Sequence, residues 1–391
     1  MSTFELTNIN IFLLEKQYLT ENSEINDIVQ ITDDICGLHS TDLKTSYLSL
    51  FARTKNFKKV DLERELYENK TLGRILGMRK TIFLQTKNMI PIVHAATFGK
   101  IEKSFGKYRE VRGVSMKEYQ DTYPQILEIL KNNELSTFEI RKKLNSKLDI
   151  LAIIQVMCNY GLLIKGKPIK NWKDRRNKYA IFKEHFPAIN LSKMDEKDAT
   201  QILVEKYIKA YGPVSETDIT WWTDIAKTKI RESLKNIESQ LQTIRISGSQ
   251  EKFIISDIDI KTFENSKVSQ DQTLVLIPEL DPYPMGYKVR EMYIDSKKYN
   301  KTFDKSGNIT STIVLDGVVI GDWDTENQVK PTVKLFLFQP LVEKLRNKPY
   351  ARAKKVGKFF FDEEVIIKEF KSMIPLTQRT AGGFMTPLKN C

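Results

Sequence analysis

The stretch LDILAIIQVMCNYGLLIKGKPIKNWKDRRNKYAIF, residues 148–182, decides the fold. Its first part, Leu148–Tyr160, has apolar residues at helical spacing and stops at Gly161, a residue type that commonly follows a helix. Leu162–Phe182 then reads as a strand, a basic loop and a second strand. A helix followed directly by a hairpin with a basic loop is typical of a winged helix.

The same order of elements recurs on both sides of this stretch. Within the same unit, Met116–Lys131 is helical, and Ser136-Thr-Phe-Glu opens another helix with a capping box. Upstream, helical segments lead into the β-like stretch Leu72–Gln85, and downstream they lead into a predicted hairpin at Leu241–Ile255. We therefore expect three tandem winged helices, although the three units share no obvious sequence repeat.

The last third of the chain has a different pattern of short apolar strands. Asp316-Gly317 lies between two of them and suits the tight turn of a hairpin. These strands predict a small β-barrel or β-sheet, and Leu341–Lys371 is expected to return to helix. The whole is an α+β protein, and we place its parts at residues 1–113, 114–190 and 191–265 for the winged helices, 266–380 for the barrel or sheet with C-terminal helices, and 381–391 for a loose tail.

Composition limits the function. The chain has 391 residues, 62 Lys and Arg against 50 Asp and Glu, a net charge of +12, and 41% hydrophobic residues, which excludes a wholly disordered chain. Its positive charge favours a polyanionic partner, with a merely Lys-rich soluble protein as the alternative. The N-terminus lacks a signal-peptide pattern, no apolar run is long enough to span a membrane, and the three separated cysteines include no CxxC pair. We therefore expect a cytoplasmic protein without disulfides or structural zinc.

Basic residues gather in two places. The first is the predicted hairpin of the second unit, where seven basic residues are accompanied only by Asp174, namely Lys165, Lys167, Lys170, Lys173, Arg175, Arg176 and Lys178. The second cluster lies between residues 344 and 358 and contains no acidic residue. One cluster alone is as easily a solvated face. Two clusters, one of them on a predicted wing, favour contact with nucleic-acid phosphates.

No P-loop, GxGxxG, HExxH or GxSxG motif occurs, so the residues by themselves indicate a multi-domain DNA-binding protein. Four segments in order, however, resemble the winged-helix DNA glycosylases of the AlkZ/YcaQ type. They are Gly37–Asp42 with the helix Ser46–Arg53, the strand Met78–Leu84, the stretch Tyr211–Trp222, and Leu276–Arg290 followed by Val314–Trp323. The order and spacing hold over nearly the whole chain.

This resemblance implies a fold, a partner and an activity. The fold would be three tandem winged helices and a β-barrel, wrapped as a basic C around duplex DNA, in a monomer. The activity would be removal of N-alkylated purines, including the unhooking of interstrand crosslinks at N7 of guanine, without a metal or nucleotide cofactor. The product would be an abasic site.

The resemblance also points to candidate catalytic residues. In the family two glutamines at positions i and i+2 hold the attacking water, and the matching positions here are His39 and Thr41. Neutral His39 could accept a proton from that water, and the Thr41 hydroxyl could orient it. Asp42 could orient His39 or stabilise positive charge on the sugar. The alternative is that these residues only cap the following helix.

Further residues are assigned less directly. Arg53, Arg74 and Arg79 are expected to contact phosphates near the lesion, with ordinary surface charge as the alternative. Asp281, Tyr283, Arg290 and Trp323 are expected to brace the barrel and its interface with the third winged helix. A DNA-binding protein that has lost catalysis, or a binder of structured RNA, remains an alternative to the glycosylase.

Overall fold

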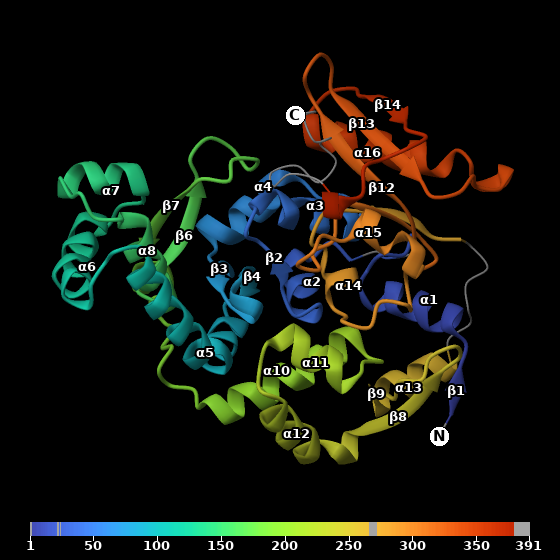
Figure 1. The fold of residues 1–391 in the computed structure, drawn as a ribbon, viewed down its shortest axis with the longest axis horizontal. Coiled ribbons are helices and arrows are strands. Elements are labelled where there is room, and N and C mark those ends of the chain that lie inside the picture. The colour runs from blue at the N-terminus through green and yellow to red at the C-terminus, as the bar shows by residue number, and fades with distance from the viewer. Residues whose placement is uncertain (1, 22, 24, 266–271, 379–391) are drawn as a thin grey trace.

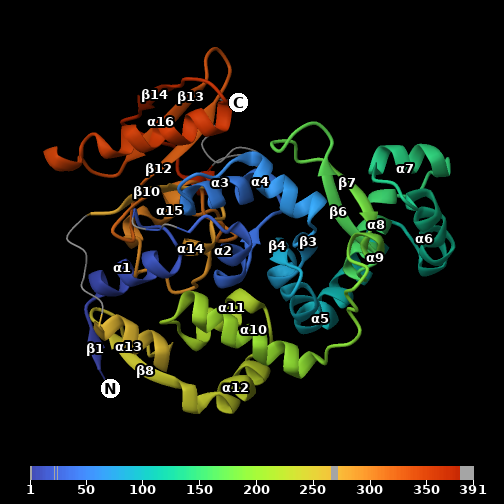
Figure 2. The ribbon, with the colours of Figure 1, turned by 180° about the vertical axis from the view of Figure 1, so that it is seen from behind.

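The computed structural model describes residues 2–21, 23, 25–265 and 272–378. Its elements form four groups (Figure 1). A first unit lies in the middle, with a second unit, a third unit and a C-terminal sheet around it, and the view from behind shows the same arrangement (Figure 2). The structure is a mixed α+β fold, as predicted.

The first unit consists of helices around a small antiparallel sheet with the strand order β2-β4-β3. Asp27 and Asp42 accept hydrogen bonds from backbone amides in the first turns of α2 and α3 and so begin these helices. In chain order its elements are α1 (Leu6–Lys16), α2 (Ile28–Asp34), β2 (Leu38–His39), α3 (Leu43–Arg53), α4 (Lys59–Glu63), β3 (Leu72–Leu76), β4 (Ile82–Thr86) and α5 (Met89–Val111).

The second unit repeats this plan with the strand order β5-β7-β6. The predicted capping box is present, since Ser136 and Glu139 each accept a hydrogen bond from the other's backbone amide. Gly161 follows α8 with a left-handed φ of 67°, as its position predicts. The elements are α6 (Met116–Leu130), β5 (Leu135–Ser136), α7 (Thr137–Leu144), α8 (Ile150–Asn159), β6 (Leu163–Pro168), β7 (Asn177–Ile181) and α9 (Phe182–His185).

The third unit contains a strand from near the N-terminal end of the described residues. β1 (Thr3–Phe4) pairs in parallel with β8, which itself forms an antiparallel hairpin with β9. Phe4 also packs edge-on against Phe263, with 4.9 Å between ring centroids. The unit's own elements are α10 (Glu196–Tyr211), α11 (Glu216–Thr223), α12 (Lys227–Asn236), β8 (Leu241–Ile246), β9 (Phe253–Ser256) and α13 (Asp257–Asn265).

The C-terminal group is an open five-stranded sheet with the order β10-β11-β12-β13-β14. The prediction of a closed barrel is therefore wrong and that of a sheet is right, because the outer strands β10 and β14 are not paired with each other. Asp316 and Gly317 have positive φ values of 47° and 82°, as a hairpin turn of this type requires. The elements are β10 (Leu274–Ile277), α14 (Pro282–Met285), α15 (Tyr299–Thr302), β11 (Thr312–Leu315), β12 (Val318–Glu326), β13 (Thr332–Leu337), α16 (Lys348–Phe361) and β14 (Ile366–Glu369).

Two expectations for the C-terminus need comment. The helix expected over Leu341–Lys371 covers only α16, because β14 then joins the sheet beside β13 in a parallel pairing. The loose tail expected at residues 381–391 lies outside the described residues.

The hydrophobic core is not divided along the predicted domain boundaries. One cluster of buried side chains combines Phe12 of α1, Val93 of α5, Tyr207 of α10, Phe253 of β9 and Tyr283 of α14. These residues come from the first unit, the third unit and the C-terminal group. The boundaries themselves stay a prediction.

A buried ion pair joins the first unit to the C-terminal group. Two of the three guanidinium nitrogens of Arg53, Nη1 and Nη2, lie 2.7 Å from carboxylate oxygens of Asp281, and neither side chain is exposed. The Ser49 hydroxyl donates to the same carboxylate at 2.8 Å, and the amide of Tyr283 donates to it at 3.0 Å. Two bonds from one guanidinium, together with these additional donors, are the geometry that a buried pair needs to offset its desolvation.

We expect Asp281→Asn to destabilise the protein by about 3–5 kcal/mol, because the Arg53 guanidinium is then left buried without a counter-charge. Denaturant and thermal unfolding measure the loss. The control is Arg231→Ala, which breaks a solvent-exposed pair with Glu216 and should cost about 1 kcal/mol or less. Equal losses in the two variants would contradict a special role for the buried pair.

Candidate active site

The candidate catalytic residues lie where β2 passes into α3. Gly37 has a φ of 95°, and a Cβ atom there would lie 2.3 Å from the Gln85 side chain, so the turn that leads into β2 requires glycine. β2 then pairs with β4, which places His39 opposite Phe83. Asp42 follows as the N-cap of α3. His39, Thr41 and Asp42 are thus held within one short junction.

His39 is a neutral imidazole in this environment. Its ring meets Phe83 edge-on at 5.9 Å, and its buried Nδ1 has no hydrogen-bond partner among the described residues. Burial, with a smaller contribution from the charge of Arg79, lowers the pKa of His39 from 6.5 to about 4. At neutral pH the ring therefore has one nitrogen that accepts a hydrogen bond.

Thr41 and Asp42 have different surroundings. Thr41 is exposed, and its hydroxyl accepts a long hydrogen bond of 3.4 Å from the amide of Ile82. One carboxylate oxygen of Asp42 caps α3 by accepting from the amide of Lys44. The other lies 2.9 Å from Nε of Arg175. The capping alternative therefore holds for Asp42, but its second oxygen also binds Arg175, which precedes β7.

Arg74 fixes the residue between His39 and Thr41. Its guanidinium is buried and donates to both the hydroxyl and the carbonyl of Ser40, at 3.0 and 2.8 Å, and to the side chain of Asn177 in β7. Arg53 is equally buried in its pair with Asp281. This placement disagrees with the expectation that Arg53 and Arg74 contact phosphates, because neither guanidinium reaches the surface.

Arg79 is placed differently from the two buried arginines. It lies in the turn between β3 and β4, where Arg79 and Lys80 have successive left-handed φ values of 52° and 58°. Its guanidinium lies 4.0 Å from the centre of the Trp221 ring. Its charge also contributes to the lowered pKa of His39.

The loop of the basic hairpin (β6, β7 and the residues between them) packs against helices α3 and α16. Trp172 at its tip is buried against Tyr47 of α3 and Phe359 of α16, with ring centroids 5.0 and 5.7 Å apart. Lys173 donates to the carbonyl of Phe360 at 3.1 Å. The loop is therefore packed on two other groups of elements, which brings Arg175 to Asp42.

The seven basic residues of this hairpin are not equivalent. Lys165 is largely buried, and burial followed by the charge of Arg74 lowers its pKa to about 8. Lys173 and Lys178 are half-buried. Those exposed to solvent are Lys167, Lys170, Arg175 and Arg176. These four side chains reach solvent, although Arg175 is paired with Asp42 and Arg176 with Asp174.

Two residues of the site, Glu279 and Lys44, have no role in the sequence prediction. Glu279 is buried, and its carboxylate lies 3.1 Å from Nζ of Lys44, which in turn lies 3.7 Å from Asp42. Burial raises the pKa of Glu279, against the opposing effect of Lys44. The signal in the sequence was its position two residues before Asp281, within the segment Leu276–Arg290.

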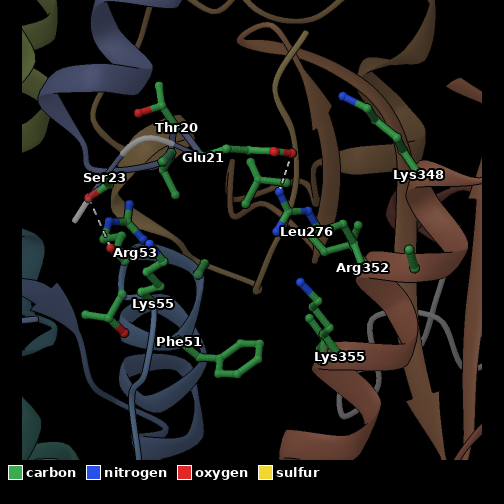
Figure 3. A pocket seen from close by; sticks show the side chains of 16 residues that line it. Thr20, Glu21, Ser23, Phe51, Arg53, Lys55, Leu276, Lys348, Arg352 and Lys355 are labelled. Carbon is green, nitrogen blue, oxygen red and sulfur yellow. Dashed lines mark hydrogen bonds and ion pairs between the residues drawn. The ribbon is translucent and has the colours of Figure 1, made fainter. Parts of the chain in front are cut away.

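The second basic cluster lies at the opposite end of α3. A groove of about 440 Å³ separates Phe51–Lys55 from α16, and Lys348, Arg352 and Lys355 line its far wall (Figure 3). Arg352 is paired with Glu21 across the groove. Because α3 has eleven residues, this groove lies about 16 Å along the helix from Asp42. It is separate from the site of His39.

The described part of the chain has neither a cluster of metal ligands nor a membrane-spanning helix. No group of three or more His, Cys, Asp and Glu side chains there could hold a metal ion. No described helix has the length and apolar character needed to cross a membrane.

Comparison with known proteins identifies relatives. The model of the AlkZ-like DNA glycosylase family matches residues 32–359. Among solved structures, the DNA glycosylase AlkZ of Streptomyces sahachiroi is similar, with a TM-score of 0.76 and 16% sequence identity over 95% of this chain and all of that one. At this identity the likeness concerns the fold alone. No match was found among curated proteins.

We expect the His39 ring to stay neutral down to about pH 4, which NMR titration of the three histidine side chains measures. The lowered pKa of His39 also makes the free energy of unfolding depend on pH. Between pH 6.5 and about 4 the folded protein binds fewer protons than the unfolded chain. The contribution of the neutral His39 ring to stability is therefore complete above pH 6.5 and is lost as the pH falls through that range.

His39→Gln assigns the resonance and should reduce the fall in stability between pH 6.5 and 4.5. A His39 resonance that titrates near pH 6.5 would contradict the burial of this ring.

Proposed function

The chain belongs to the AlkZ-like family of DNA glycosylases, and from this premise we propose that it removes alkylated purines from duplex DNA. The reaction is hydrolysis of the N-glycosidic bond by a water held at the junction of β2 and α3, and it leaves an abasic site. The observation that carries the proposal is the placement of His39, Thr41 and Asp42 in the short junction of β2 and α3, where the carboxylate of Asp42 both caps α3 and binds Arg175.

The chemistry of the proposed substrate explains why an active site with few polar side chains would suffice for the hydrolysis. An N7-alkylguanine is cationic, so the base leaves with the bonding electrons of C1′–N9 and becomes neutral without being protonated. The enzyme then has to stabilise positive charge on the sugar and to hold a water in line with C1′. The carboxylate of Asp42 suits the first task.

His39 and Thr41 suit the second task. A ring with a pKa of about 4 is a weak base, so we assign His39 to accepting a hydrogen bond from the water rather than to taking its proton early. The exposed hydroxyl of Thr41 is a further partner for the same water. The proton leaves to solvent once the new C1′–O bond has formed.

The DNA duplex would be held by the exposed cations Lys167, Lys170, Arg175 and Arg176, together with Arg79. We interpret the three helix-and-hairpin units as winged helices that surround the duplex in a C. The protein would act as a monomer in the cytoplasm, without a cofactor. Simple N7 adducts are the proposed substrate, with crosslinks between guanines as a second class to be tested.

The catalytic assignment is tested by single-turnover release of N7-methylguanine from duplex DNA, read as alkali-induced strand cleavage. We expect His39→Ala to slow release by about 10²–10³-fold and Thr41→Ala by less, because each removes one partner of the water. Affinity for the duplex, measured by fluorescence anisotropy, should remain within about twofold of the wild type for both variants, since neither residue is a cation.

Equal losses of release and affinity would mean that these residues are structural. No release by the wild type from either the methylated or the crosslinked duplex, with tight binding to one DNA sequence, would instead favour a DNA-binding protein without catalysis.

The basic hairpin makes a separate prediction. Lys167→Ala and Lys170→Ala should weaken binding to damaged and undamaged duplexes equally, because phosphates carry no information about the base. Each lost contact should lower the slope of log affinity against log salt by about 0.9. Lys197→Ala, which removes an exposed lysine of α10 paired with Glu232, is the matched control and should leave the slope unchanged.

A further inference from the structure

Four charged side chains meet at the candidate active site in a connected chain of ion pairs, and the buried guanidinium of Arg74, which donates to Ser40, lies near Asp42 as well. Asp42 lies 2.9 Å from Arg175 and 3.7 Å from Lys44, and Lys44 lies 3.1 Å from Glu279. Two carboxylates thus face two cations. A carboxylate that stabilises a cationic sugar must act with a net negative charge, so the neutralisation of Asp42 by its two partners needs an explanation.

Glu279 binds Lys44, which is one of the two cationic partners of Asp42. Its carboxylate is closer to Lys44 than Asp42 is, and its backbone is fixed because its amide donates to the Ser311 hydroxyl at 3.0 Å. Two residues further on, Asp281 is held by Arg53 in the buried pair. These contacts hold Glu279 beside α3, where its carboxylate pairs with Lys44.

Arg175 is the partner that can leave. Its side chain is 58% exposed and binds the Asp42 carboxylate through Nε, whereas the side chains of Asp42, Lys44 and Glu279 are mostly buried. It lies on the basic hairpin, whose exposed cations we assigned to the DNA backbone. A guanidinium binds a phosphate through two parallel hydrogen bonds, so a phosphate competes well for it.

We infer that Glu279 is a positioning residue that occupies Lys44, and that a DNA phosphate takes Arg175 from Asp42 when the duplex binds. Asp42 then loses its nearest counter-charge only in the complex, next to the sugar. This inference rests on the proposed function, because it assigns Asp42 to a cationic reaction centre. It makes the phosphate of the bound DNA a part of the active site.

The first test measures charge preference without catalysis. The probes are two duplexes, one with a cationic pyrrolidine in place of the sugar and one with neutral tetrahydrofuran. We expect the wild type to prefer the cationic duplex by about tenfold, the effect of one favourable charge contact. Glu279→Gln should abolish this preference, because Lys44 then turns to Asp42. Lys44→Gln/Glu279→Gln should restore it, which excludes misfolding as the cause of the loss.

The second test is a double-mutant cycle on the neutral duplex. Asp42→Asn should tighten binding several-fold in the wild type, because Arg175 no longer has to leave a carboxylate. In an Arg175→Ala background the same change should have no effect. The matched control is Arg176→Ala, whose guanidinium is bound to Asp174, and there Asp42→Asn should still tighten binding.

These outcomes are separable from those of the proposed function. The inference is overturned if the wild type shows no charge preference, or if Asp42→Asn has the same effect with and without Arg175. Both tests use binding alone. A wild type that passes them but releases no alkylated purine would refute the proposed reaction and leave the exchange of Arg175 standing.

Discussion

The buried pair of Arg53 and Asp281 is the interaction on which the site depends. It joins the last turn of α3 to the segment before α14, and Lys44 joins the first turn of the same helix to Glu279 in the same segment. Helix α3 is thereby fixed at both ends to the C-terminal group. Since Asp42 caps this helix, the position of its carboxylate follows from contacts made along the whole helix.

Local features of the fold could be predicted from the sequence because their causes are local. The capping box at Ser136 and the turn at Asp316-Gly317 involve residues no more than three positions apart, and both are present. The junction at His39–Asp42 was found through the resemblance of its flanking residues to a family. The prediction of a closed barrel was wrong because the pattern of short strands does not show whether the two outer strands pair with each other.

The arginines could not be assigned in this way. Arg53 and Arg74 look like surface cations in the sequence, but their partners Asp281 and Asn177 lie 228 and 103 positions away. Asp281 was expected to brace the interface with the third unit, whereas its strongest contact is with the first. The contacts of Trp172 and Glu279 could not be predicted for the same reason, because their partners lie in distant segments of the sequence.

The pairing of β1 with β8 has a consequence for synthesis on the ribosome. Thr3 and Phe4 find their partners Arg245 and Ile246 only after some 240 further residues have been made. At about 5–20 residues per second this takes roughly 10–50 s, during which β1 has no strand to pair with. Arg53 likewise has no counter-charge until Asp281 has been made. The second unit has a core of its own and can form earlier, whereas the first and third units are completed only late in translation.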